Sequence, residues 1–279
     1  MEKQYKHQLF FGVLTLLLLL ISFSGATYAW FTFSGDTNVE PLEGGIGYGD
    51  GDLLIALSPD GPFSDHCELN ALGENTLLRP LSTADLNTFY AAREHDRSGI
   101  SIRFSREEDI SDSAVRGTVY LKSERNANAL YLDPNRLDFG SDAQALASLR
   151  LGLVITARSG VYTYIFRLDD MGIADDVQAR QTIAQPGCVV GSVDADGAPG
   201  FVPDPGLALS DFFAAGTEDP DTMSPGRKLL CILSADEVAR VDYFLYLEGC
   251  DENCFNPVQG RLLALSLGFA GFVTDGEVQ

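Results

Sequence analysis

Lysine is almost absent from this chain. The 279 residues contain Lys3 and Lys6 at the start, and after residue 29 only Lys122 and Lys228. The formal net charge is −21, and removing residues 1–29, which carry +1, leaves −22. A surface of that sign repels phosphate backbones and anionic membrane surfaces. The composition therefore excludes nucleic acid as a partner and suits a solvated surface, divalent cations or a basic partner.

The sequence also lacks the short motifs of the large enzyme classes. It contains no Gly-x-Ser-x-Gly elbow and no glycine-rich phosphate loop ending in Lys-Ser or Lys-Thr. Among three histidines, His95 has no second histidine at the spacing of a helical zinc-protease motif. Paired carboxylates are too frequent in so acidic a chain to indicate acid–base catalysis. We predict no catalytic residue and no cofactor, and a secreted hydrolase is the weakest of the alternatives.

Cysteine is scarce for a disulfide scaffold of this size. The five cysteines are Cys67, Cys188, Cys231, Cys250 and Cys254. Cys250 and Cys254 flank a short Asp-Glu-Asn turn, and we predict a disulfide between them because export permits oxidation. Together with His66-Cys67 they would also make four zinc ligands, but nothing in the sequence brings the two pairs together. Cys231 lies in an apolar run and is expected to be a buried small hydrophobe.

Two acidic segments look like fragments of calcium loops. They are the pair Asp50 and Asp52, and Asp194 with Asp196 in a Gly- and Pro-rich stretch. Neither segment has the full series of calcium ligands or a closing Glu at the proper distance. A solvated turn is the default interpretation of both, and we predict no metal site.

The longest apolar run lies at the start of the chain, from Leu9 to Phe23. Its length fits the core of a signal peptide better than the roughly 20 apolar residues of a membrane-spanning helix. Thr27 and Ala29 occupy the small-residue positions that a signal peptidase needs before a cut at Trp30. We predict that residues 1–29 are a cleaved signal peptide, and the competing interpretation is an uncleaved membrane anchor.

Short alternating segments typical of β-strands dominate the rest of the sequence. The expected strands are 53–58, 100–104, 116–122, 129–132, 149–157, 161–167, 229–233, 239–247 and 262–272. Arg158-Ser159-Gly160 predicts a hairpin between two of them, and the strands at 116–122 and 129–132 are expected to form a second hairpin-like unit. With no helix–strand alternation, the simplest fold is an all-β antiparallel sandwich of two sheets.

Two short helices are expected between these strands. One spans residues 83–93, with Ser82 or Thr83 as its cap, and the other spans residues 142–148, with Ser141 as its cap.

The organisation along the chain follows from these patterns. Residues 30–52 are expected to be an N-terminal extended segment and a Gly- and Asp-rich linker. Residues 53–279 are expected to be one β-sandwich domain, interrupted at 169–227 by a long irregular insertion rich in Pro, Gly and Asp. A loop of that length in a compact domain is usually functional or mobile.

Two passages carry a resemblance to a known family. Residues 26–32, Ala-Thr-Tyr-Ala-Trp-Phe-Thr, resemble the signal region of the TasA/camelysin family of Gram-positive exported matrix proteins. Residues 245–254, Leu-Tyr-Leu-Glu-Gly-Cys-Asp-Glu-Asn-Cys, with the last strand to Phe272, are similar to clostridial surface proteins that bear that signal. Together these passages cover about a fifth of the chain.

The resemblance implies a jelly-roll sandwich, cleavage by a dedicated signal peptidase, and a secreted or cell-surface location. In some members it also implies fibre assembly by an N-terminal strand that passes to the next subunit. Here that donor would be the segment from Trp30 to Val39, with Trp30, Phe31 and Phe33 as its aromatic residues. The segment can equally be an ordinary first strand of its own domain.

Three functions follow as expectations. The first is an exported structural protein of the cell surface or extracellular matrix that acts by self-association or by binding other surface proteins. The second is a monomeric surface module that binds glycan or a divalent cation through residues 169–227. The third is the secreted hydrolase. In the first two, the membrane is contacted only through the N-terminal segment.

Overall fold

The structure is a computed structural model of the whole chain, which divides into residues 1–39 and 40–279. It describes residues 43–47, 52–69, 78–95, 102–140, 143–169, 187–214, 228–251, 253–254 and 265–274. The predicted cleavage residues Thr27, Ala29 and Trp30 and the donor residues Phe31 and Phe33 lie outside these ranges. Within them no helix is long and apolar enough to cross a membrane.

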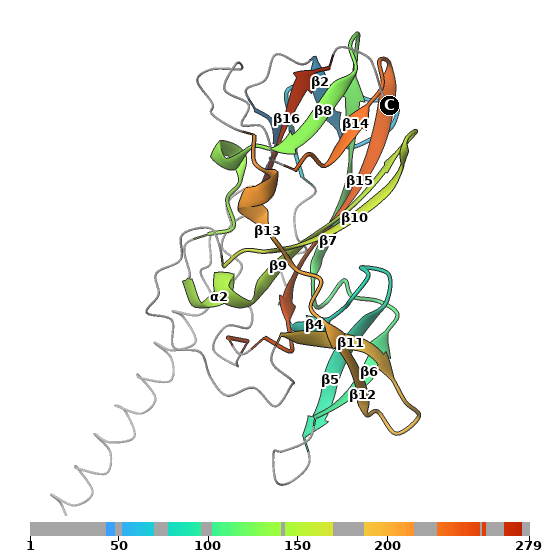
Figure 1. The fold of residues 1–279 in the computed structure, drawn as a ribbon, viewed down its shortest axis with the longest axis vertical. Helices are drawn as coiled ribbons and strands as arrows, with labels where there is room; N and C mark the ends of the chain where they lie inside the picture. The colour runs from blue at the N-terminus through green and yellow to red at the C-terminus, as the bar shows by residue number, and fades with distance from the viewer. Residues whose placement is uncertain are drawn as a thin grey trace, which may run out of the picture. The chain divides into compact units, whose positions relative to one another are not determined.

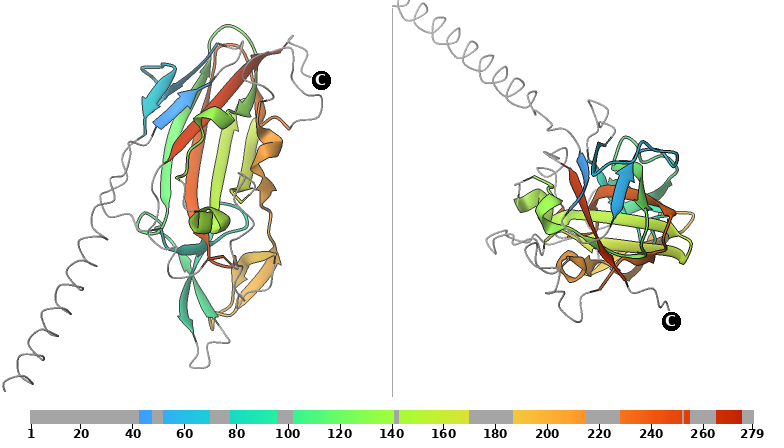
Figure 2. Two further views of the ribbon diagram at one scale, coloured as in Figure 1. Left: turned by 90° about the vertical axis from the view of Figure 1, so that its left-hand side faces the viewer. Right: turned by 90° about the horizontal axis from the view of Figure 1, so that it is seen from above.

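Among the described residues, sixteen strands in three sheets make up almost all of the regular structure, and there is very little helix (Figures 1 and 2). The predicted all-β class is confirmed. The number of strands exceeds the nine predicted from the sequence, because several strands have only two to four residues.

The first sheet has five strands in the order β14-β8-β16-β1-β3. These are β14 (Cys231–Leu233), β8 (Asn128–Leu132), β16 (Ser266–Val273), β1 (Glu43–Ile46) and β3 (His66–Glu68). Only β1 and β16 pair in parallel; the other pairs are antiparallel.

Strand β1 lies in the part of residues 30–52 predicted to be a Gly- and Asp-rich linker, and it corrects that part of the prediction. Its two glycines gave no strand signal, since glycine is depleted in strands. Their surroundings are close: a Cβ on Gly45 would lie 2.6 Å from Arg136 Nη1, and one on Gly44 would lie 3.1 Å from Ile55 Cδ1. The chain therefore forms a sheet strand in which the side chains of neighbouring residues pack closely on the two glycines.

The second sheet is organised by β15 (Glu237–Glu248). One side of β15 pairs with β9, which continues to β10 and β13. The other side of β15 pairs along most of its length with β7, and β7 pairs in turn with β2. At Leu247–Glu248 the same side pairs with β4, which pairs with β5, and β5 pairs with β6. The strands are β2 (Leu53–Ala56), β4 (Pro80–Ser82), β5 (Phe89–His95), β6 (Ile102–Glu107), β7 (Val115–Ser123), β9 (Leu149–Ala157), β10 (Gly160–Arg167) and β13 (Leu207–Ala208).

The third sheet is the hairpin of β11 (Cys188–Val193) and β12 (Pro199–Pro203), which lies beside β5 and β6 (Figure 1). With β13 and the short 3-10 helix η2 (Leu209–Phe212), it corrects the prediction that 169–227 is irregular throughout. The Gly- and Asp-rich sequence forms the hairpin turn instead: Asp194 Oδ1 accepts hydrogen bonds from the N–H groups of Asp196 and Ala198.

One of the two expected helices is present. Helix α2 (Ala143–Ser148) confirms the expected helix at 142–148, and a 3-10 turn, η1 (Pro134–Arg136), precedes it. The helix expected at 83–93 is wrong: residues 84–88 form a turn that leads into β5. Thr83 Oγ1 accepts hydrogen bonds from the N–H groups of Asp85 and Leu86. These bonds favour a turn over a helix.

The two predicted hairpins have different outcomes. Strands β9 and β10 pair around Arg158-Ser159 as expected. Strands β7 and β8 do not pair, because β7 belongs to the second sheet and β8 to the first. Asn128 Nδ2 donates to Ser123 Oγ and to Asp52 Oδ1, so polar bonds hold the connection where the chain crosses between sheets.

The main core lies between the first and second sheets. Val119 and Leu121 of β7 face it, as the alternation predicted, together with Ile155 and Phe269. A smaller cluster lies on the opposite face of the second sheet, under β4 and β5. Its members are Leu81, Leu86, Phe89, Ile110, Ala114, Ile165 and Tyr246. The candidate site adjoins Tyr246 on this second face.

Candidate functional site

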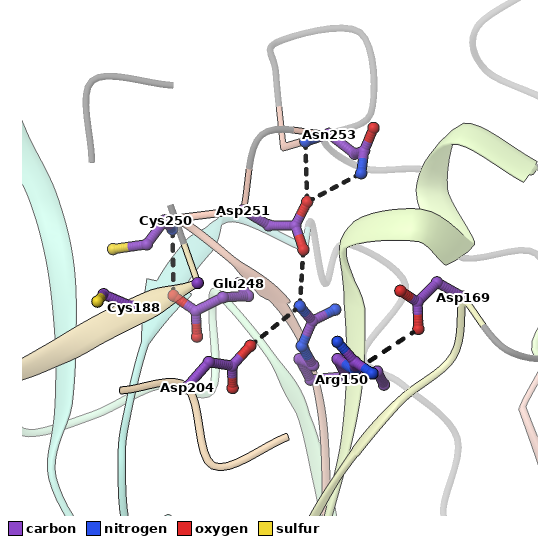
Figure 3. A pocket seen from close by; sticks show the side chains of 10 residues that line it. Arg150, Asp169, Cys188, Asp204, Glu248, Cys250, Asp251 and Asn253 are labelled. Atoms are coloured by element: carbon purple, nitrogen blue, oxygen red, sulfur yellow. Dashed lines mark hydrogen bonds and ion pairs between the residues drawn. The ribbon is translucent and has the colours of Figure 1, made fainter. Parts of the chain in front are cut away.

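A polar cavity of about 200 Å3 lies where β9 begins and β15 ends (Figure 3). Arg150 of β9 is opposite Tyr246 of β15 on one side and opposite Arg167 of β10 on the other. Side chains directly opposite one another share a face of the sheet. The residues that line the cavity are Arg150, Arg167, Asp169, Gly187, Cys188, Asp204, Glu248, Cys250, Asp251 and Asn253.

Arg150 is the central cation, with only 3% of its side chain exposed. Its Nη2 lies 2.6 Å from Asp251 Oδ2 and 3.5 Å from Asp204 Oδ2. Burial acts to lower the pKa of the guanidinium, but the carboxylates of Asp251 and Asp204 outweigh it, with a smaller contribution from Glu248 when that group is ionised, so the pKa is raised. Arg150 is therefore charged at every physiological pH.

The two aspartates are held in place by their own turns. Asp251 Oδ1 accepts hydrogen bonds from the backbone N–H and the side-chain amide of Asn253. Asp204 Oδ1 accepts one from the N–H of Gly206. In each carboxylate, one oxygen is used by the turn and the other faces Arg150.

Glu248 is 2% exposed, and its two oxygens differ. Its Oε1 accepts the N–H of Cys250 at 3.1 Å, whereas Oε2 has no hydrogen-bond partner in the described part of the chain. Burial raises the pKa of the carboxyl to about 8, although Ser82, Arg150 and the Cys250 N–H act to lower it. The carboxyl is therefore mostly protonated at neutral pH.

The outer part of the cavity carries a second, weaker pair. Arg167 Nε lies 3.9 Å from Asp169 Oδ1, and both side chains are more than two-fifths exposed. With Arg150, Arg167 and the three aspartates ionised, the lining has a net charge of −1 while Glu248 keeps its proton, and −2 without it.

Both cysteines of the predicted disulfide, Cys250 and Cys254, lie at or next to this site. The structure contains no disulfide among the five cysteines, all of which are described, and the predicted pairing of Cys250 with Cys254 stays a prediction. Burial raises the pKa of both thiols, that of Cys254 to about 12, and the nearby Glu248 raises them further. Cys231 is buried, as predicted, and its pKa is raised to about 12 for the same reason.

The burial of these thiols predicts that they are alkylated slowly in the folded protein. A thiol with a pKa of about 12 has a thiolate fraction about 1,000-fold below that of a free cysteine at pH 8. After reduction, Cys231 and Cys254 should react with iodoacetamide at least ~100-fold more slowly in the folded protein than in urea. Peptide mass spectrometry measures each site separately. Alkylation of either thiol at the unfolded rate would contradict the buried sites.

The predicted metal fragments have structural roles. His66, on β3 of the first sheet, pairs with Asp65, whereas Cys250 and Cys254 lie in the turn after β15 of the second sheet, so the two halves of the zinc set are not assembled. Asp52 binds the N–H of Arg125 and the amide of Asn128, and Asp194 closes the β11–β12 turn. Within the described ranges, no group of three or more His, Cys, Asp or Glu side chains could hold a metal ion.

Sequence reasoning missed Arg150, Asp204, Glu248 and Asp251 altogether. One signal was available: Arg150 is the only charged residue between Leu149 and Ala157, and Glu248 ends an otherwise apolar run from Tyr243. A charged residue inside an apolar strand is either exposed or paired, and the pattern alone does not distinguish the two.

Comparisons with known proteins identify no relative of the chain. No family model matches it, and neither the curated proteins nor the solved structures contain a match. The fold and site define an all-β sandwich protein with a buried arginine–carboxyl cavity.

Proposed function

We propose that the chain is an exported structural protein of the cell surface or matrix, and that it acts by self-association. Three features support the proposal: the apolar run from Leu9 to Phe23, the strongly acidic body and the all-β fold. The resemblance of residues 26–32 to the TasA/camelysin signal region adds to them. In this proposal the sandwich is of the jelly-roll type and the cut falls before Trp30.

The observation that carries the proposal is the open edge of β10. This strand pairs with β9 along its whole length, but on its other side only Phe166 and Arg167 pair with a described strand, β13. Residues 160–165, Gly-Val-Tyr-Thr-Tyr-Ile, contain no charge and no proline, and Val161 is 65% exposed. An uncharged edge rich in aromatic and β-branched residues favours pairing with another strand.

The donor in this proposal is the segment from Trp30 to Val39 of a second copy. Cleavage after Ala29 would free it as a new N-terminus with three aromatic residues in its first four positions. An extended segment of this kind adds to a sheet edge through backbone hydrogen bonds, and its alternate side chains give specificity.

We predict that protein beginning at Trp30 forms filaments or large oligomers. Sedimentation velocity and electron microscopy measure this directly. Val161→Glu should weaken association at least tenfold, because a charge on an edge strand opposes pairing. Val238→Glu is the matched control, since Val238 is exposed on β15 but is paired with Lys122 of β7.

A strictly monomeric product at high concentration would overturn the proposal and leave the monomeric glycan- or cation-binding module in its place. Equal weakening by both substitutions would show that β10 is not the edge that pairs.

A further inference from the structure

Strand β14 and most of β10 lie at edges of the two larger sheets, and the β9–β10 hairpin contacts β14. In the described residues β14 pairs only with β8, and β10 has only the two-residue β13 beyond it. An edge strand presents N–H and C=O groups to which another strand can add. The proposed function uses the edge of β10, so the state of the β14 edge determines whether a second copy finds one acceptor strand or two.

The hydrogen bonds of β8 show which groups of β14 point outward. Successive residues of an antiparallel strand bond alternately to its two neighbours. The N–H of Asp133, at the end of β8, donates to a carbonyl of β16, so the odd-numbered residues of β8 face β16. The even-numbered residues face β14, as the 2.7 Å bond from Leu230 N–H to Leu130 O shows. Ile232 lies opposite the odd-numbered Ala129, so its N–H and C=O point away from β8.

Hydroxyl groups of the hairpin already bind this outer side of β14. Tyr164 Oη donates to Leu230 O, just before the strand, and Ser159 Oγ donates to Ile232 O at 3.3 Å. The Tyr164 ring is held in place by an edge-to-face contact with Phe212, at 5.2 Å between the ring centroids. The N–H groups of an added strand would bond to the same carbonyls, and the two hydroxyl oxygens occupy the positions that those groups would need.

The buried carboxylate of Glu237 fixes the hairpin turn next to β14. Glu237 is 1% exposed. Its Oε1 accepts the N–H of Arg158 in the turn, and its Oε2 accepts the N–H of Ser234, the residue after β14, at 2.7 Å. One carboxylate thereby joins the turn that carries Ser159 to the end of β14. The Ser159 hydroxyl is therefore positioned by other bonds besides its own.

We infer that Tyr164 and Ser159 restrict strand addition to β10, because their hydroxyl groups close the edge of β14. The inference rests on the proposed function, in which the added strand is the segment from Trp30 to Val39 of a second copy. A subunit with one donor and one acceptor strand joins its neighbours head to tail, which gives an unbranched filament. A second acceptor edge on β14 would allow branching, so the two hydroxyl groups determine the form of the assembly.

The test counts acceptor edges with a fluorescent synthetic peptide of residues 30–39. The peptide is titrated with the full-length chain, and anisotropy gives the number of peptides bound per chain. The wild type should bind one peptide, at β10. Tyr164→Phe with Ser159→Ala, the hydroxyl-free variant, should bind two, because it lacks both hydroxyl groups and keeps the aromatic ring. In a Val161→Glu background, where a charge closes β10, the same two substitutions should strengthen binding by at least ~10-fold.

Tyr162→Phe is the matched control, because it makes the same change on the same strand at a tyrosine that takes no part in the two bonds to β14. It should bind one peptide. Adding Ile232→Lys to the hydroxyl-free variant should return the number from two to one, because a charge on an edge strand opposes pairing. One peptide per hydroxyl-free chain, two per Tyr162→Phe chain, or two in the presence of Ile232→Lys would overturn the inference.

The same titrations separate the inference from the proposed function. A wild type that binds no peptide, or that binds it equally well after Val161→Glu, contradicts the β10 edge and with it the proposed function. One site in both the wild type and the hydroxyl-free variant contradicts only the role of Tyr164 and Ser159. No site in the wild type and one in the hydroxyl-free variant supports the closed β14 edge without the β10 acceptor, and no site in either protein overturns both.

Discussion

Replacing Arg150 with methionine should lower the free energy of unfolding by about 3–5 kcal/mol, because it leaves largely buried carboxylates without a cationic partner. The guanidinium is the partner of both Asp204 and Asp251, whose side chains are largely buried. Methionine fills a similar volume but carries no charge, so the two carboxylates would face each other and the partly protonated Glu248 without a cation. Urea unfolding at pH 7, followed by circular dichroism, measures the loss.

Two further variants separate charge from packing. In Arg150→Met with Asp204→Asn and Asp251→Asn, most of the lost stability should return, because neutral amides need no cation. Arg167→Met is the matched control: this arginine is 44% exposed, and its pair with Asp169 should contribute less than about 1 kcal/mol. A loss below 1 kcal/mol in Arg150→Met would contradict the arrangement of the cavity.

Local patterning predicted the strands whose two faces have different surroundings. Val119 and Leu121 alternate with polar residues because β7 has one face on the core. The hairpin at Arg158-Ser159 could also be predicted from neighbouring residues, since a tight turn between two alternating segments leaves few other ways for them to pair. These parts of the fold depend on neighbours within a few residues.

The missed strands depend on distant partners. Strand β1, which contains two glycines, pairs with β16, more than 200 residues further along the chain. Strands β7 and β8 are close in sequence, yet they pair with β15 and β16 rather than with each other. Residues 83–93 have helical propensity, but the side chains of Thr83 and Asp85 accept hydrogen bonds from nearby backbone N–H groups, and these bonds hold a turn in place of a helix. Tertiary contacts override propensity in all three cases.

The candidate site could not be predicted for the same reason. Arg150 meets Asp204 and Asp251, which lie 54 and 101 residues away in the sequence. No spacing rule joins residues that far apart. Nothing within β9 itself indicates that Asp204, in the loop after β12, and Asp251, in the turn after β15, lie beside Arg150. The site is a property of the sheet topology.

The stability of the folded domain should fall between about pH 4.5 and pH 8 because of Glu248. The folded carboxyl keeps its proton up to about pH 8, whereas the unfolded one loses it near 4.5, so in this interval the folded state binds more protons. At about 1.4 kcal/mol per pH unit, this one group lowers the free energy of unfolding by about 5 kcal/mol between pH 4 and pH 9. The loss is complete once the pH exceeds the folded pKa.

Glu248→Gln isolates this contribution from the many other carboxyl groups. Glutamine does not titrate, so the variant and the wild type should differ by a constant amount below pH 4.5, and the variant should become steadily more stable than the wild type up to pH 8. All other acids cancel in the difference, including the surface carboxylates whose own titration raises stability between pH 3 and 5. Urea unfolding of both proteins at unit pH steps gives the difference curve. Parallel curves over the whole range would show that Glu248 has an ordinary pKa in the folded protein. In that case the Arg150 cavity would already contain a cation, or enough water to solvate the carboxylate.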